Sequence, residues 1–232
     1  MERHFHEQLD DIKKKLMIMG GLAEEIVTMG IRALQERDDE MALSIFKYDK
    51  RIDMMELEVD GTCLKLLALQ QPMAVDLRHI AGMMKISSDL ERIGDHATNI
   101  AGSVLRLRNQ ADDPEMVNDL IQMAKTTLQM VKDSLDSFVE RDAEKARSVC
   151  IRDDIVDGLN RSNIVKAIAR MEKDSTMVRA CVDYISISKD LERIADMATN
   201  VAEDVVFIYL ARVIKHHADE MEGSDVGVEE DA

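Results

Sequence analysis

Hydrophobic residues recur at alternating intervals of three and four along two long segments of the chain, residues 73–109 and 175–215. This spacing places apolar side chains at the a and d positions of a heptad, which is typical of amphipathic helices that bury one seam. The seam residues are Met83, Ile86, Leu90, Ile93, Ala97, Ile100, Val104 and Leu107 in the first segment, and Tyr184, Ile187, Leu191, Ile194, Ala198, Val201, Val205 and Ile208 in the second.

Capping residues and the two prolines divide the chain into further helices. Asp38 and Asp142 stand where an N-cap carboxylate would accept hydrogen bonds from free backbone amides. Pro72 and Pro114 stand where a first-turn proline is tolerated, and Asp113 would cap the helix that begins at Pro114. Each residue adds a rise of about 1.5 Å to a helix, so the long helices predicted here favour elongated bundles. The predicted helices span residues 5–36, 39–70, 73–109, 114–140, 143–171 and 175–215.

The two halves of the chain are copies of each other. Residues 86–101 match residues 187–202 at 12 of 16 positions with an offset of 101, and residues 36–53 are echoed in residues 140–157 with an offset of 104. Each half therefore holds the same three helices. The fold class predicted is all-α, as two tandem pseudo-symmetric three-helix bundles at residues 1–110 and 111–215, followed by a disordered acidic tail at residues 216–232.

Composition agrees with helices and restricts the partners. The 232 residues include only 10 Gly and 2 Pro and carry a formal net charge of −16. That charge excludes direct binding to nucleic acid or to an anionic membrane, and it favours cations or basic protein surfaces. Cys63, Cys150 and Cys181 are too few and too scattered for a disulfide framework. No segment approaches the roughly 20 apolar residues of a membrane span, so we expect a cytoplasmic protein.

Carboxylates four residues apart form the strongest candidate site. On a helix this spacing stacks both groups on one face within about 6 Å, where they repel each other unless a cation lies between them. Ligand sets made only of oxygen suit iron, manganese, magnesium or calcium, and also zinc. The candidate pairs are Asp49 with Asp53 and Glu91 with Asp95 in the first half, and Asp153 with Asp157 and Glu192 with Asp196 in the second.

The four acidic pairs differ from ordinary solvated acids in that each recurs in both halves of the chain. A single acidic pair would be read as a polar helix face, and Glu91 and Asp95 fall at the b and f positions, away from the seam. All four pairs nevertheless return at the duplication offsets, whereas neighbours such as Gly94 and His96 do not. Common descent of the two halves would also preserve part of this pattern, so solvated acidic helix faces stay open as the alternative to a cation site. Such a site would lie on the bundle surface, with a regulatory or bridging role more than a catalytic one.

Two further repeated residue types have open roles. Asn99 and Asn200 extend each acidic stripe by one turn, so they either hydrogen-bond to the metal ligands or pack as interhelical amides. Arg78 and Arg179 recur near the start of the third and sixth helices, where they either contact an anion or a partner, or else form a cap or an ion pair.

The doubled motif resembles the PhoU family of phosphate-uptake regulators. The resemblance rests on Asp76-Leu77-Arg78, on DLERIGDHATNIA in the first half, and on DLERIADMATNVAEDV in the second, and it extends over residues 3–213. It implies six helices in two pseudo-symmetric three-helix bundles. It also implies that the four acidic pairs bind multinuclear clusters of iron or zinc on the bundle surface, with manganese or magnesium as further candidates. One departure is that Glu56 aligns with Asn160, which gives a fifth carboxylate to the first cluster only.

The same resemblance implies a function without enzymatic turnover. Members of the family are expected to restrain phosphate import and the phosphate-starvation response by contacting the ATP-binding subunit of the phosphate ABC transporter and a sensor histidine kinase. A homodimer is expected, and contact with the membrane only through these partners. Long bundle flanks and an acidic surface are compatible with such docking.

Two rival interpretations remain open at this stage. A carboxylate-bridged iron oxidase or iron store would require a Glu-x-x-His pair on its helices, but Gly94 and Ala195 follow Glu91 and Glu192 at that spacing. A helical scaffold without metal is the other alternative.

Overall fold

The computed structural model describes residues 2–212 and contains six long helices joined by short turns. Within this part of the chain there is no β-strand, which confirms the all-α prediction. The predicted tail at residues 216–232 lies outside the described residues. The helices are α1 (Glu2–Glu36), α2 (Asp39–Gln70), α3 (Ala74–Leu107), α4 (Pro114–Glu140), α5 (Ala143–Lys173) and α6 (Val178–Leu210), with a 3₁₀ turn, η1 (Ser175–Met177), before α6.

Local capping chemistry explains where three of the helices begin. The Asp38 carboxylate accepts a hydrogen bond from the backbone N–H of Met41 at 2.9 Å and so caps α2. Asp113 and Asp142 cap α4 and α5 in the same way, and Pro114 occupies the first turn of α4. All three predicted caps are therefore confirmed.

Several boundaries differ from the predictions, and three of the differences have a local cause. Pro72 lies in the extended link before α3 and not in its first turn, because Gln71 adopts a left-handed conformation, with φ of 46°, and ends α2. The last helix begins at Val178 and not at residue 175, since Asp174 caps η1 by accepting from the backbone N–H of Thr176. At the other end, left-handed Ala211 closes α6 after Leu210, where the periodicity had extended the helix to residue 215.

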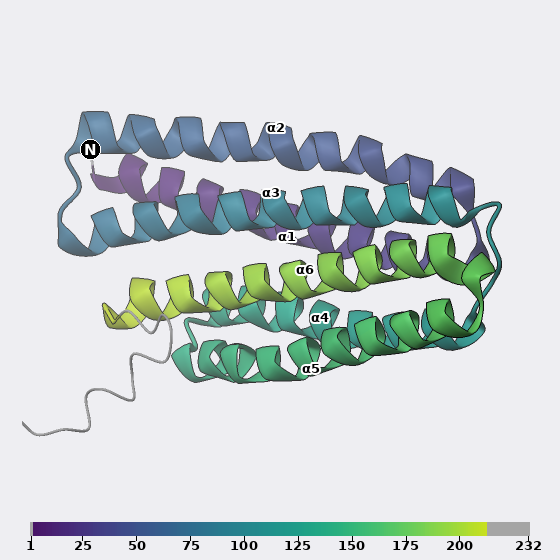
Figure 1. Cartoon of the computed structure of the whole chain (residues 1–232). Coiled ribbons are helices and arrows are strands. Elements are labelled where there is room, and N and C mark those ends of the chain that lie inside the picture. Colours follow the sequence, from purple (N-terminus) through teal and green to yellow (C-terminus); the bar gives the residue numbers. More distant parts are fainter. Residues whose placement is uncertain (1, 213–232) are drawn as a thin grey trace, which may run out of the picture.

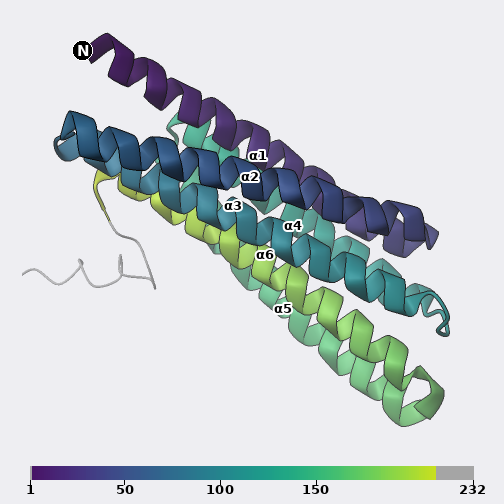
Figure 2. The same cartoon turned by 90° about the horizontal axis from the view of Figure 1, so that it is seen from above.

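The helices form two three-helix bundles that lie side by side (Figure 1). Helices α1, α2 and α3 make one bundle and α4, α5 and α6 make the other, with α3 against α6 and α1 against α4 between them. Figure 2 shows the same six rods from above, with α3 and α6 running alongside each other. Ion pairs from Lys85 to Asp204 at 3.0 Å and from Arg106 to Asp183 at 2.7 Å show that α3 and α6 are antiparallel.

The predicted seams form the centre of the core. All sixteen apolar residues assigned to the seams of α3 and α6 are buried. Each of these helices contacts two helices of its own bundle as well as the other central helix, so little of its surface remains for solvent. Burying each large aliphatic side chain contributes about 1.5–3 kcal/mol. None of the helices within residues 2–212 has an apolar stretch long enough to cross a membrane.

Candidate metal centre

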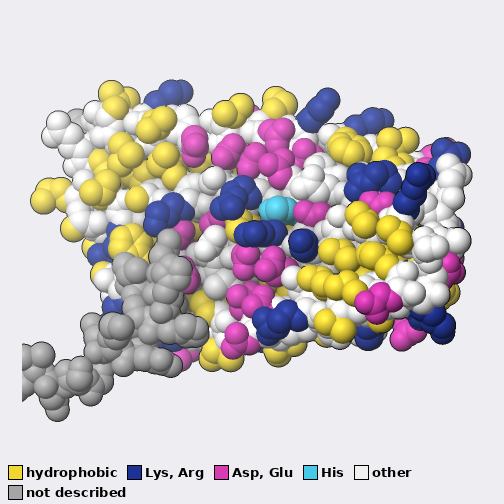
Figure 3. Space-filling model, in the orientation of Figure 1, with side chains coloured by type: hydrophobic (Ala, Val, Ile, Leu, Met, Phe, Trp, Pro, Cys, Tyr) yellow, Lys and Arg dark blue, Asp and Glu magenta, His cyan; other side chains and the backbone are white. Residues whose placement is uncertain are grey.

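Neighbouring helices bring the predicted acids together in two groups. We call Asp49, Asp53 and Glu56 of α2 with Glu91 and Asp95 of α3 the first acidic cluster; their charges act on one another. We call Asp153 and Asp157 of α5 with Glu192 and Asp196 of α6 the second acidic cluster. Figure 3 shows acidic patches over α2–α3 and over α5–α6 on one face of the molecule, with basic side chains and a histidine between them.

Burial raises the pKa values of three acids in the first acidic cluster. Desolvation, together with the charges of Asp53 and Asp95, raises the pKa of Asp49 to about 6. Desolvation is also the largest cause that raises the pKa of Glu91, to about 7, and the charges of Asp95, Glu56, Asp53 and Asp49 add to it. The pKa of Glu56 is also raised, again mainly by desolvation. Both desolvation and repulsion disfavour the charged carboxylates, and a bound cation would relieve both.

One aspartate in each cluster has a buried oxygen without a hydrogen-bond partner. These atoms are Oδ1 of Asp49 and Oδ1 of Asp153, which the duplication places at equivalent positions. In the first acidic cluster, a Cβ on Gly94 would lie only 2.7 Å from Asp49 Oδ1, so the glycine leaves room for this oxygen against α3. An unsatisfied buried polar group costs about 1–3 kcal/mol. The donor set, made only of carboxylate oxygens, therefore fits a hard cation such as manganese or magnesium, and also iron or zinc.

The carboxylates do not yet converge on a single point. Within residues 2–212, no group of three or more His, Cys, Asp or Glu side chains could hold a metal ion as the side chains stand. Mutual repulsion keeps like charges apart, so binding requires the carboxylates to rotate towards the ion.

The second acidic cluster contains two basic partners, Arg193 within the repeated motif and Arg161 outside it. Arg161 forms an ion pair with Asp157 at 3.3 Å. Arg193 lies 3.7 Å from both Glu192 and Asp196. Burial still raises the pKa of Asp153 to about 6, with Asp196 and Asp157 adding to the shift. The available signal was the departure from the repeat, because Leu57 occupies the position of Arg161 in the first half.

The two asparagines reach across the junction between the bundles. Asn99 donates a hydrogen bond to Asp190 at 3.4 Å, and Asn200 donates to Asp89 at 3.4 Å. His96 Nδ1 also lies 3.0 Å from Asp190. These bonds connect α3 with α6, as expected of interhelical amides. A role for either asparagine in supporting metal ligands stays a prediction.

The repeated arginines near the helix starts lie apart from both clusters. Arg78 donates to the backbone carbonyl of Ile208 at 3.2 Å, close to the end of α6. Arg179 is exposed near the start of α6. Contact of either arginine with an anion or a partner stays a prediction.

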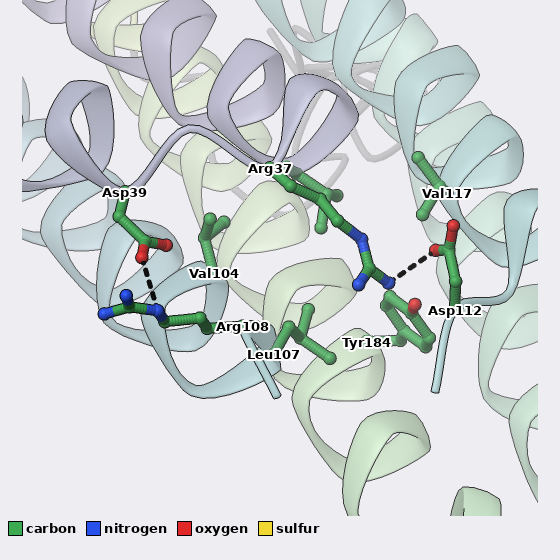
Figure 4. Close-up of a pocket in the computed structure, with 9 residues that line it drawn as sticks. Arg37, Asp39, Val104, Leu107, Arg108, Asp112, Val117 and Tyr184 are labelled. Carbon is green, nitrogen blue, oxygen red and sulfur yellow. Dashed lines mark ion pairs between the residues drawn. The ribbon is translucent and has the colours of Figure 1, made fainter. Parts of the chain in front are cut away.

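A small cavity of about 50 Å³ lies where the α1–α2 turn meets the end of α3 and the start of α6 (Figure 4). Arg37 pairs with Asp112 at 2.9 Å and Arg108 pairs with Asp39 at 2.9 Å. Since both guanidinium groups face carboxylates, the cavity is a structural junction and not an anion site. Its walls are Leu34, Arg37, Asp39, Val104, Leu107, Arg108, Asp112, Val117 and Tyr184.

The raised pKa values predict an unusual pH dependence of stability without metal. The folded state binds protons at Asp49, Glu91 and Asp153 more tightly than the unfolded chain does. The chelator-treated protein should therefore be least stable above about pH 7 and gain stability as the pH falls towards about 4.5. Thermal melts in EDTA, followed by circular dichroism, measure this.

The control for this prediction removes the titrating groups. A variant with Asp49→Asn, Glu91→Gln and Asp153→Asn should show a smaller rise in Tm over the same pH range. A wild-type Tm that stays constant or falls between these pH values would contradict the prediction.

Comparison with known proteins places this architecture in a family. The model of the PhoU domain matches residues 16–104 and 120–205. A phosphate-specific transport system accessory protein PhoU homolog of Clostridium acetobutylicum is 36% identical over 211 residues, covering 90% of this chain and 96% of that protein. A homolog with the same description from Zymomonas mobilis is 36% identical over 222 residues, covering 96% and 92%.

Solved structures agree with the sequence relatives. The crystal structure of PhoU from Pseudomonas aeruginosa is similar with a TM-score of 0.87 and 32% identity, covering 90% of this chain and 100% of that one. PhoU from Streptococcus pneumoniae is similar with a TM-score of 0.82 and 32% identity, covering 90% and 98%. The duplicated helical bundles, the repeated acidic motifs and these matches together show that the chain belongs to the PhoU family.

Proposed function

We propose that this protein is a cytoplasmic, metal-binding regulator that restrains phosphate import and the phosphate-starvation response. Membership of the PhoU family supports this role, because relatives over most of the chain are described as accessory proteins of the phosphate-specific transport system. The regulator acts by contacting the ATP-binding subunit of the phosphate ABC transporter and the sensor histidine kinase, and it functions as a homodimer.

The observation that carries metal binding is the pair of equivalent acidic clusters, each with an unpartnered buried oxygen. The ligands are Asp49, Asp53, Glu91 and Asp95 in the first cluster, and Asp153, Asp157, Glu192 and Asp196 in the second. A bound cation supplies positive charge that links carboxylates of adjacent helices. Metal would thereby fix α2 against α3 and α5 against α6, and stabilise the face that carries both clusters.

Exposed apolar side chains on α2 support a docking role for the same region. Met54 is 64% exposed, Leu57 69% and Leu64 56%, and all three lie along one side of α2 near the first acidic cluster. Apolar residues gathered on an otherwise polar surface mark sites of protein–protein contact. The first acidic cluster and this apolar stripe (Met54, Leu57 and Leu64) together present a partner with both charge and hydrophobic area.

A pull-down tests the docking role. The purified chain should retain the transporter ATP-binding subunit and the kinase, and the double variant Leu57→Asp, Leu64→Asp should lose at least about tenfold of this affinity, since charge is introduced into an apolar contact. Ile18→Asp is the matched control, because Ile18 is equally apolar and 54% exposed but belongs to α1.

The outcomes of the pull-down test the adaptor role and the docking surface separately. If neither partner binds the wild-type chain, the adaptor role is wrong. If the apolar-stripe variant binds as well as the Ile18→Asp control, contact with the partners occurs on another surface.

The alternative function, a carboxylate-bridged iron oxidase, would need a histidine ligand beside its acids. His96, which lies next to Asp95 in the sequence, instead contacts Asp190 of the other half. A regulator loaded with iron should show no sustained peroxide-dependent ferroxidase turnover, and sustained turnover would instead support the catalytic alternative.

A further inference from the structure

We infer that the two acidic clusters are unequal cation sites, and that the first acidic cluster fills before the second because arginines already neutralise the second. This inference rests on the proposed metal binding. It concerns which of the two sites binds first, and it assigns Arg161 and Arg193 a role in setting that order.

Among residues 2–212, the first acidic cluster has no basic ion-pair partner. None of its five carboxylates forms an ion pair with a Lys, Arg or His side chain among residues 2–212. The charged neighbours that raise the pKa values of Asp49, Glu56 and Glu91 are all acids. Asp60, one turn further along α2, adds to this negative charge beside Glu56. A cation that enters here displaces no protein charge and removes repulsion among the acids.

The second acidic cluster is already occupied by guanidinium groups. Arg161 holds Asp157 at 3.3 Å, and Arg193 lies within 3.7 Å of Glu192 and of Asp196. Arg92 and His96 of α3 also act on Asp196 from across the junction between the bundles. A cation that enters this cluster must compete with these groups for the same oxygens.

The two clusters differ in charge at two adjacent sequence positions. Glu56 and Leu57 of the first half correspond to Asn160 and Arg161 of the second, which exchanges one negative for a neutral residue and one neutral for a positive residue. The Asn160 Oδ1 atom accepts a hydrogen bond from Ser188 Oγ at 2.9 Å. Asn160 is therefore engaged with a buried serine and does not replace the missing carboxylate.

Identical arginines in the repeated motif also make different contacts. Arg92 and Arg193 are equivalent in the duplication, but Arg92 pairs with Asp89 at 3.4 Å, outside the first acidic cluster. Arg193 pairs with two members of the second. Both arginines thus act on the second acidic cluster, and neither compensates the first.

Calorimetric titration of the chelator-stripped full chain with Zn²⁺ tests the order of filling. We expect two classes of site whose dissociation constants differ by at least about tenfold. Glu91→Gln with Asp95→Asn should remove the tight class, and Glu192→Gln with Asp196→Asn should remove the weak class. Far-UV circular dichroism verifies that each variant remains helical.

Exchanging the residues at positions 56–57 and 160–161 between the halves tests whether these residues cause the difference in affinity. Asn160→Glu with Arg161→Leu gives the second half the residues of the first, and should tighten the weak class towards the tight one. Glu56→Asn with Leu57→Arg is the reciprocal exchange and should weaken the tight class. Each exchange uses residues that the chain already accepts at the equivalent helix position, so the pair forms a matched control.

The outcomes separate this inference from the proposed function. Zn²⁺ binding with equal affinity at both clusters, or exchanges that leave both affinities unchanged, would overturn the inference and leave metal binding intact. Loss of the tight class in the Glu192→Gln, Asp196→Asn variant would reverse the proposed order. Failure of the wild-type chain to bind Zn²⁺ at either cluster would overturn the proposed metal-binding function and this inference with it.

Discussion

Replacing Glu91 by Gln and Asp95 by Asn should lower the affinity of the first acidic cluster for metal at least about tenfold without loss of helix. Both side chains lie away from the buried seam of α3, and Asp95 is exposed. Their removal takes two carboxylates from the ligand set and lessens the repulsion acting on Asp49. In the presence of chelator the variant should therefore be at least as stable as the wild-type chain.

Elemental analysis of protein purified without chelator or affinity tag, together with far-UV circular dichroism, measures this result. Glu115→Gln with Asp119→Asn is the matched control, because these acids have the same spacing but are paired with Arg170 and Lys166. The control should keep its metal. Unchanged metal content in the Glu91→Gln, Asp95→Asn variant would contradict the assignment, and a loss of helicity would place these residues in the core.

The substitution Leu90→Ala should reduce the free energy of unfolding by about 2–5 kcal/mol. Leu90 is fully buried in the seam of α3, one position before Glu91, so its removal leaves a cavity at the centre of the first bundle. Urea denaturation followed by circular dichroism measures the change.

An exposed residue provides the comparison for Leu90. Met54→Ala removes a side chain that is 64% exposed on α2 and should change stability by no more than about 0.5 kcal/mol. Equal effects of the two substitutions would show that the seam of α3 is not the core. The pair also separates stability from docking, since Met54 belongs to the apolar stripe and Leu90 does not.

Helix boundaries and the core could be predicted because both depend on local signals. Every residue that the a and d periodicity assigned to a seam is buried, and the side chains of Asp38, Asp113 and Asp142 cap the helices that follow them. Pro72 was misplaced because the left-handed turn at Gln71 carries no glycine or asparagine to signal it.

The acidic clusters were predictable only in part. The duplication indicated which acids form the candidate site, and the structure brings them together as two groups. Which acid Arg92 and Arg193 pair with could not be predicted, because each arginine has one aspartate three residues before it and another three residues after it; Arg92 pairs with Asp89 and Arg193 with Asp196 of its own helix. The contacts of Asn99 and Asn200 depend on how one bundle lies against the other.

The crossed hydrogen bonds between α3 and α6 carry an evolutionary consequence. Asn99 with Asp190 and Asn200 with Asp89 are the same interaction made twice, related by a two-fold rotation. A lone ancestral repeat that paired with its twin through this helix would have formed both bonds from a single gene product. With both copies in one chain, equivalent positions can differ, and the second half carries Arg161 where the first half carries Leu57.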